Sequence, residues 1–299
     1  MKKILLILLA GTITFADQLF TPLPQNIEYN KQKATLGQKL FFDPILSKNK
    51  DISCFSCHSN YGTDNLAVSI GTNGEKGETN SLSIFNLPFK IAYFWDGRSQ
   101  TLQEQMINGP LYNSHEMASD KETIEKRLKQ SQEYVQLFQK IFNKKPSLEL
   151  TLDALTEYQK SLISINSRFD KFLRNEIKLT EKEKKGMGLF IEYGCVSCHN
   201  GINVGGNSYQ QLGSVIGFKK MELKSENNSL VFVVPSLRNV AMTYPYFHDG
   251  SVKSLQEAIK QMAYHNVGVK LTDNEIQAIE SFLKTLTGEI PKNFKKVTQ

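Results

Sequence analysis

All four cysteines of this 299-residue chain fall into two copies of one short motif, and this feature constrains the fold more than any other. The motifs read Cys54-Phe-Ser-Cys57-His58 and Cys195-Val-Ser-Cys198-His199. C-x-x-C-H is the pattern of covalent haem c attachment. In that chemistry two thiols add to the vinyl groups of one porphyrin, and the histidine reaches the iron as its proximal ligand. We therefore expect two covalently bound haem c groups, one in each half of the chain.

Three other interpretations of the paired cysteines fit the sequence less well. A disulfide within each C-x-x-C pair would not explain why a histidine follows both pairs. A thioredoxin-like redox site is expected in a βαβ setting, which the sequence does not indicate. A zinc site would draw its four ligands from both halves, and two C-x-x-C pairs so far apart are a weak zinc pattern.

The first residues have the pattern of a secretory signal peptide. Lys2 and Lys3 precede a short apolar stretch, residues 4–10, and residues 14–16 form a small-x-small cleavage site. The apolar stretch is shorter than the roughly 20 residues that span a bilayer, although an uncleaved anchor is an alternative. We expect a signal peptide over residues 1–16, a mature chain from Asp17, and a periplasmic location without stable membrane insertion.

The two halves of the chain resemble each other beyond the haem motifs. Three pairs of segments match in the same order: 37–41 with 186–190, 83–86 with 236–239, and 94–104 with 247–257. The last two pairs share one offset of 153 residues, which indicates an internal duplication. We expect an N-terminal haem domain over residues 17–166 and a C-terminal haem domain over residues 167–299.

The periodicity of the apolar residues predicts a mainly α fold. Thr180-Glu-Lys-Glu183 and Thr272-Asp-Asn-Glu275 have the pattern of capping boxes, and each is expected to open a helix. Residues 122–142 and 152–172 are expected to form two further long helices. Strand signals are few: residues 89–96 are apolar but interrupted by turn residues, and residues 230–234 form only a short segment. The expected architecture is two cytochrome c-like haem domains.

The halves differ where the second axial ligand of each iron would originate. The second half has Met262, whereas the first half has Gly109 at the corresponding position. The first half instead has Glu116 nearby, and the second half has no equivalent acid. Methionine ligation raises the potential of a haem and suits electron transfer, while an open iron near a carboxylate suits peroxide chemistry. Core packing for Met262 and a solvated charge for Glu116 are the alternatives that this pattern leaves open.

At this point the sequence resembles a known family, the bacterial di-haem cytochrome c peroxidases, over nearly the whole mature chain. The matching stretches are residues 36–44, 94–98, 116–117, 245–250, 262, 271–273 and 282–288. The resemblance implies that the haem held by His58 is the peroxidatic one. By the same match, the haem held by His199 and Met262 receives the electrons. Glu116 matches the catalytic acid/base of the family, and Trp95 matches the residue between the haems.

The resemblance also implies one calcium ion between the domains and a homodimeric assembly. The matching calcium ligands are Asn80, through its side chain, and the backbone carbonyls of Thr243 and Pro245. A set made only of oxygen ligands is typical of calcium sites.

One position departs from many family members, which place a histidine in the loop after the first haem motif, where it blocks the peroxidatic iron. Thr72 occupies that position here, and no histidine lies in the loop. We therefore expect the iron opposite His58 to be open. His115 remains an alternative ligand for this iron, and His265 is a weaker rival of Met262 for the other.

The predicted function is the reduction of hydrogen peroxide to water with electrons from a small periplasmic cytochrome c or copper protein. One alternative is a di-haem electron-transfer cytochrome without catalysis. The other is a related di-haem oxidase that acts on a protein substrate, although that enzyme uses tyrosine in place of the methionine. The net charge of +6 is dispersed, as in residues 121–145, and forms no dense basic stripe, so a nucleic-acid partner is not expected.

Overall fold

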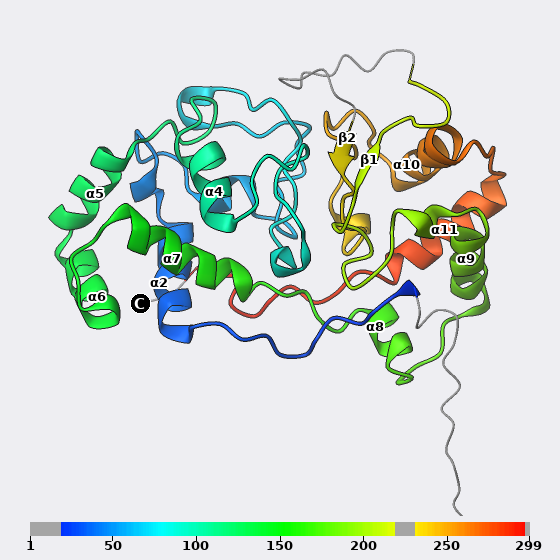
Figure 1. The fold of residues 1–299 in the computed structure, drawn as a ribbon, viewed down its shortest axis with the longest axis horizontal. Helices are drawn as coiled ribbons and strands as arrows, with labels where there is room; N and C mark the ends of the chain where they lie inside the picture. The colour runs from blue at the N-terminus through cyan, green and yellow to red at the C-terminus, as the bar shows by residue number, and fades with distance from the viewer. Residues whose placement is uncertain (1–18, 219–230, 297–299) are drawn as a thin grey trace, which may run out of the picture.

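The computed structural model describes residues 19–218 and 231–296, which form two mainly helical halves lying side by side (Figure 1). The expected signal peptide lies outside the described residues. The elements of the first half are α2 (Lys31–Phe42), η1 (Pro44–Leu46), α3 (Cys54–Cys57), η2 (Thr72–Gly74), η3 (Leu87–Phe89), α4 (Leu102–Met106), η4 (Ile107–Leu111), α5 (Lys121–Gln130), α6 (Gln132–Phe142) and α7 (Leu148–Lys160). Those of the second half are α8 (Arg168–Leu173), α9 (Glu181–Glu192), η5 (Cys195–Ser197), β1 (Tyr209–Gln211), β2 (Val231–Val233), η6 (Val240–Met242), α10 (Leu255–Met262), η7 (Ala263–Val267) and α11 (Asp273–Lys284).

Each half is built around two helices that cross at a glycine. Helix α2 packs on α7 in the first half, and α9 packs on α11 in the second. A side chain at Gly37 would collide with the backbone of Ala154, and one at Gly186 would collide with the backbone of Ala278. The two glycines belong to segments that match between the halves, so the repeated sequence performs the same packing task twice.

The repeat continues in the segments that lead to the sites. Phe94 and Phe247 both adopt positive φ angles, 66° and 68°. Thr101 caps the N-terminus of α4 and Ser254 that of α10, and both helices continue into a π-helical turn, η4 and η7. The expected fold class, two mainly α haem domains related by duplication, is therefore confirmed.

Several predicted elements are confirmed, and two are wrong. Thr180 and Thr272 form capping boxes that open α9 and α11. The single helix expected over residues 122–142 is broken at Ser131, whose side chain accepts a hydrogen bond from the Tyr134 N–H and so starts α6. The helix expected over residues 152–172 is also divided, because α7 ends at Lys160 and an extended segment precedes α8.

The two ends of the chain cross between the halves. The described chain begins beside the second half and then runs to α2 in the first half. The C-terminal segment leaves α11 in the second half and ends close to α2 and α7 (Figure 1). The ring of Phe20 packs edge-on against Phe169 at 5.2 Å and contacts Phe282 in the core of the second half. Phe294 is partly buried and packs edge-on at 4.9 Å against Phe85, which belongs to the core of the first half.

A buried ion pair fastens the N-terminal segment to the second half. Arg238 Nη1 lies 3.0 Å from Asp170 Oδ2, and both side chains are almost fully shielded from solvent, at 1% and 0% exposure. The other Asp170 oxygen accepts the Leu23 N–H at 2.9 Å, and Arg238 Nη2 donates to the Thr21 carbonyl at 3.1 Å. Each charge therefore has both an opposite charge and a backbone partner, as buried ions require.

Within residues 19–218 and 231–296, no helix has the length and apolar character needed to cross a bilayer.

Candidate functional site

The first C-x-x-C-H motif forms the short helix α3, and its side chains line a cavity of about 520 Å³. One helical turn places Cys54 and Cys57 on the same face, with His58 directly after the helix. The Nδ1 atom of His58 lies 2.6 Å from the Gly62 carbonyl oxygen, so donation of this N–H leaves Nε2 for a metal. Burial lowers the pKa of His58, which favours the neutral imidazole that an iron ligand requires.

Glu116 lines the same cavity as the first haem motif. Burial raises the pKa of its carboxyl group, and the charge of Arg98 and a hydrogen bond from Asn113 oppose this shift. The hydrogen bond runs from Asn113 Nδ2 to Glu116 Oε1 at 3.2 Å and fixes the orientation of the carboxyl group. The cavity thus contains an oriented acid that can exchange a proton with a bound molecule.

The difference between Gly109 and Met262 has a structural cause in the first half. A side chain at Gly109 would collide with the ring of Phe94, which lines the first cavity. The ring is held by Arg98, whose guanidinium carbon lies 3.6 Å from the ring centroid. The ring of Phe94 therefore lies in the first half where the second half has the thioether of Met262. Two methionines that belong to the core of the first half, Met106 and Met117, also line this cavity.

Thr72 does not face the cavity. Its hydroxyl group donates to the Asp51 carboxylate, with both oxygens 2.8 Å away, and its side chain is fully buried. The Thr72 N–H donates to the Glu116 carbonyl at 2.8 Å. A side chain at the adjacent Gly71 would collide with the His115 carbonyl oxygen. These contacts hold the loop against the segment that carries Glu116.

His115 lines the first cavity but has a partner elsewhere. Its Nδ1 atom lies 3.8 Å from Glu75 Oε2, and these two side chains are 42% and 56% exposed. The backbone N–H of His115 is bound by the Asn113 side chain at 2.8 Å.

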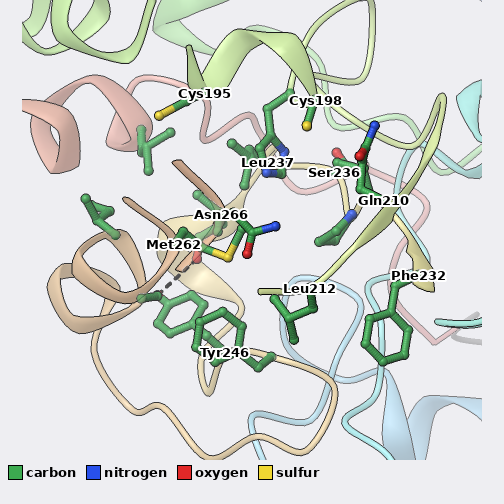
Figure 2. A pocket seen from close by; sticks show the side chains of 18 of the residues that line it. Cys195, Cys198, Gln210, Leu212, Phe232, Ser236, Leu237, Tyr246, Met262 and Asn266 are labelled. Carbon is green, nitrogen blue, oxygen red and sulfur yellow. Dashed lines mark hydrogen bonds between the residues drawn. The ribbon is translucent and has the colours of Figure 1, made fainter. Parts of the chain in front are cut away.

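The second motif lines a separate cavity of about 250 Å³. Cys195 and Cys198 lie on one side of this pocket, and Met262 lies on the opposite side (Figure 2). Burial lowers the pKa of His199 to about 4, so its imidazole is neutral at ordinary pH. All four cysteines of the chain are free of disulfide bonds. Paired thiols beside a neutral imidazole fit a covalently attached haem in each cavity.

Met262 and His265 occupy different environments. Met262 ends α10 and lines the second cavity, together with Asn266 of the π-helical turn η7 (Figure 2). His265 is not among the lining residues. Its ring stacks on Phe218 at 3.7 Å, and its Nδ1 atom lies 2.7 Å from the Ile216 carbonyl oxygen. Of the two, only Met262 presents a ligand atom to this cavity.

Trp95 lies in the wall between the two cavities and lines both of them. Its Nε1–H donates to the Asn80 carbonyl at 2.9 Å, and the Val233 N–H of strand β2 donates to the Trp95 carbonyl at 2.8 Å. Two further rings, Phe232 and His248, also line both cavities and stack on each other at 4.9 Å. Trp95 packs edge-on against both rings.

The three residues matched to a calcium site border the same cavity. Asn80, Thr243 and Pro245 all line the second cavity. The Asn80 amide nitrogen donates to the Leu66 carbonyl at 2.8 Å, which leaves the amide oxygen as the end that can bind a cation.

Sequence reasoning overlooked three contributors to this region: Phe232, Arg98 and Lys90. Arg98 lies within the repeated segment, so its difference from Ser251 of the second half was a usable signal. Lys90 differs in the same way from Thr243, so it offered a signal of the same kind. Phe232 carries no comparable signal, because only the packing of the two halves brings it to the common wall.

Comparisons with known proteins agree with this architecture. Residues 31–178 match the family model described as di-haem cytochrome c peroxidase, and residues 183–287 match the model described as cytochrome c. The chain is 40% identical to the cytochrome c551 peroxidase of Nitrosomonas europaea, over 92% of this chain and 86% of that protein. It is 38% identical to the cytochrome c551 peroxidase of Pseudomonas aeruginosa, over 93% of this chain and 86% of that protein.

A solved structure shares the same fold. It is a MauG-like protein associated with microbial copper homeostasis, with a TM-score of 0.80 and 28% sequence identity, and the match covers 92% of this chain and 95% of that one.

Proposed function

The chain belongs to the family of di-haem cytochrome c peroxidase enzymes, and from this premise we propose that it reduces hydrogen peroxide at the cavity beside His58. The reaction consumes one peroxide molecule, two electrons and two protons, and it releases two water molecules. The observation that carries the proposal is the position of Glu116, an oriented carboxyl group in the same cavity as the first haem motif.

The haem groups, when bound, supply the iron that binds peroxide and the redox capacity that a two-electron reduction requires. Cys54, Cys57 and His58 would hold the first haem, and Cys195, Cys198, His199 and Met262 the second. The chain itself supplies proton transfer. Glu116 takes the proton from one peroxide oxygen and delivers it to the other, so that the departing oxygen leaves as water.

The surroundings of Glu116 suit this shuttle. A carboxyl group with a raised pKa exchanges protons more readily near neutral pH than an exposed one does. The hydrogen bond from Asn113 holds the carboxyl group in place, and the nearby charge of Arg98 limits how far the pKa rises.

Trp95 would stand between the two haem groups, of which the one held by His199 and Met262 would supply the site of electron entry. In support of this route, Trp95, Phe232 and His248 are in ring contact and border both cavities. The donor in this proposal is a small soluble cytochrome c or copper protein.

The same proposal includes a calcium ion held by Asn80, Thr243 and Pro245, export by a cleaved signal peptide, and two haem domains that meet near residue 166. The supporting observation for calcium is that all three residues border one cavity close to the wall between the halves.

A peroxide assay tests the proposal. Mass spectrometry first establishes two covalent haems per chain, and reduced cytochrome c or cupredoxin is then offered as the donor. We expect two donor molecules to be oxidised for each peroxide consumed. A protein with both haems that shows no peroxide-dependent oxidation of either donor would contradict the proposal and favour an electron-transfer cytochrome.

A further inference from the structure

Among the described residues, Lys90 is the one Lys, Arg, Asp or Glu that lines both cavities. It follows η3 and lines both the first and the second cavity. Eight residues of the described chain border both cavities: Asn80, Ser81, Leu82, Ser83, Lys90, Trp95, Phe232 and His248. None of the eight is acidic. Burial lowers the pKa of His248, which favours the neutral form of its imidazole. Lys90 is thus the one lysine or arginine among these eight residues, and no aspartate or glutamate among them offsets its positive charge.

The position of Lys90 is fixed by contacts between the two halves. The N–H of the next residue, Ile91, donates to the Gly206 carbonyl at 2.9 Å. A side chain at Gly206 would lie 3.3 Å from Lys90 Cγ, so the glycine makes room for the lysine stem. Gly206 belongs to the loop that follows the second haem motif. Lys90 therefore lies at a contact between the two halves of the chain.

The ammonium group of Lys90 has no counter-charge in the described part of the chain. Neither an ion pair nor a side-chain hydrogen bond involves it there. Burial alone lowers the pKa of Lys90 to about 8. Removing an ammonium ion from water is costly unless an anion or strong acceptors replace the lost hydration.

Each haem carries two propionate carboxylates, which are the anions that haem attachment would bring to these cavities. We propose that Lys90 forms an ion pair with a propionate of the haem held by His58 and thereby raises the reduction potential of that haem. A cation near the iron disfavours the oxidised, more positive state, and pairing also offsets the negative charge of the propionate. The inference rests on haem attachment and is independent of peroxide chemistry.

Two observations assign this role to the first haem. Lys90 belongs to the first half and lines the cavity that also contains Cys54, Cys57 and His58. The duplicated position in the second half is occupied by Thr243, which is neutral. The lysine therefore adds a charge to one copy of the repeat only, and by raising the potential of the His58 haem it would bring that potential closer to that of the haem held by His199 and Met262.

Substitution of Lys90 tests the ion pair. Lys90→Met removes the charge and keeps most of the side-chain volume, while Lys90→Arg keeps the charge. Lys126→Met, on the exposed surface of α5, is the matched control for loss of a positive charge. The midpoint potentials of both haems are measured by redox titrations followed with optical and electron paramagnetic resonance spectra, which need no peroxide turnover.

We expect Lys90→Met to lower the potential of the His58 haem, with a smaller shift at the His199 haem. Lys90→Arg and Lys126→Met are expected to leave both potentials near those of the parent protein. Loss of one covalent haem from Lys90→Met but not from Lys90→Arg would also support the ion pair. Unchanged potentials in Lys90→Met would overturn it. So would equal shifts in Lys90→Met and Lys90→Arg, or a larger shift at the His199 haem.

Discussion

Replacement of Glu116 by glutamine isolates the proton transfer that the first cavity is proposed to perform. Glutamine keeps an oxygen that can accept the 3.2 Å hydrogen bond from Asn113, so the side chain is expected to stay in place. What is lost is the ability to take up and release a proton. General acid–base catalysis is typically worth about 10²–10⁴ in rate, or about 3–5 kcal/mol of barrier. We expect Glu116→Gln to slow peroxide reduction by a factor in that range.

The pH profile provides a second signature of the same group. Burial raises the pKa of Glu116, and only the ionised form can accept the first proton from peroxide. The rate of the parent enzyme should therefore rise with pH through a pKa above the ordinary glutamate value of about 4.3. Glu116→Gln should lose this acid limb, because glutamine does not titrate.

Stopped-flow mixing of the protein with peroxide measures the rate, and Glu78→Gln is the matched control. Glu78 lines the same cavity but is exposed. A stability measurement separates lost chemistry from misfolding. A raised pKa means that the folded protein favours protonated Glu116, so ionisation at higher pH costs stability. Glu116→Gln should then unfold at the same or a higher temperature near neutral pH. Equal rates for Glu116→Gln and the parent would refute the assignment.

Three further predictions concern the irons and the fold. If Met262 ligates the second iron, Met262→His should lower the reduction potential of that haem by on the order of a hundred millivolts. An unchanged potential would mean that Met262 is a packing residue and not an iron ligand. Because Thr72 is turned away from the first cavity, the oxidised protein should show a high-spin ferric signal in its electron paramagnetic resonance spectrum. Two low-spin signals would contradict this, and loss of one in His115→Ala would identify the ligand. Arg238→Met leaves the buried Asp170 carboxylate without its ion-pair partner and should lower the free energy of unfolding, measured by denaturant titration, by about 3–5 kcal/mol. A loss below about 1 kcal/mol would exclude a stabilising role for the ion pair.

Local sequence signals predicted the parts of the fold that depend on near neighbours. The capping boxes at Thr180 and Thr272 were predictable because both hydrogen bonds join residues three positions apart. The break at Ser131 was missed because the apolar period continues through it, although serine is a favoured N-cap. The glycine at position 37 was predictable as part of a repeat, but not as the contact point of two helices.

The site divides in the same way. The haem motifs and the contrast between Gly109 and Met262 are visible by comparing the two halves of one sequence. Phe232 lies on β2, where it pairs with Gln210 of β1, and its ring contact with His248 is a tertiary contact that no local pattern in the sequence predicts. The orientation of Thr72 depends on Asp51, a residue ahead of the first haem motif, and no pattern in the sequence announces that hydrogen bond.

The crossed termini make each half dependent on residues from a distant part of the sequence. Phe294 packs against the core of the first half, and its ring centroid lies 5.8 Å from that of Phe55, which stands inside the first C-x-x-C-H motif. Phe20, near the other end of the described residues, is buried in the core of the second half. The two halves are thus interlocked by their termini, and neither is a self-contained packing unit.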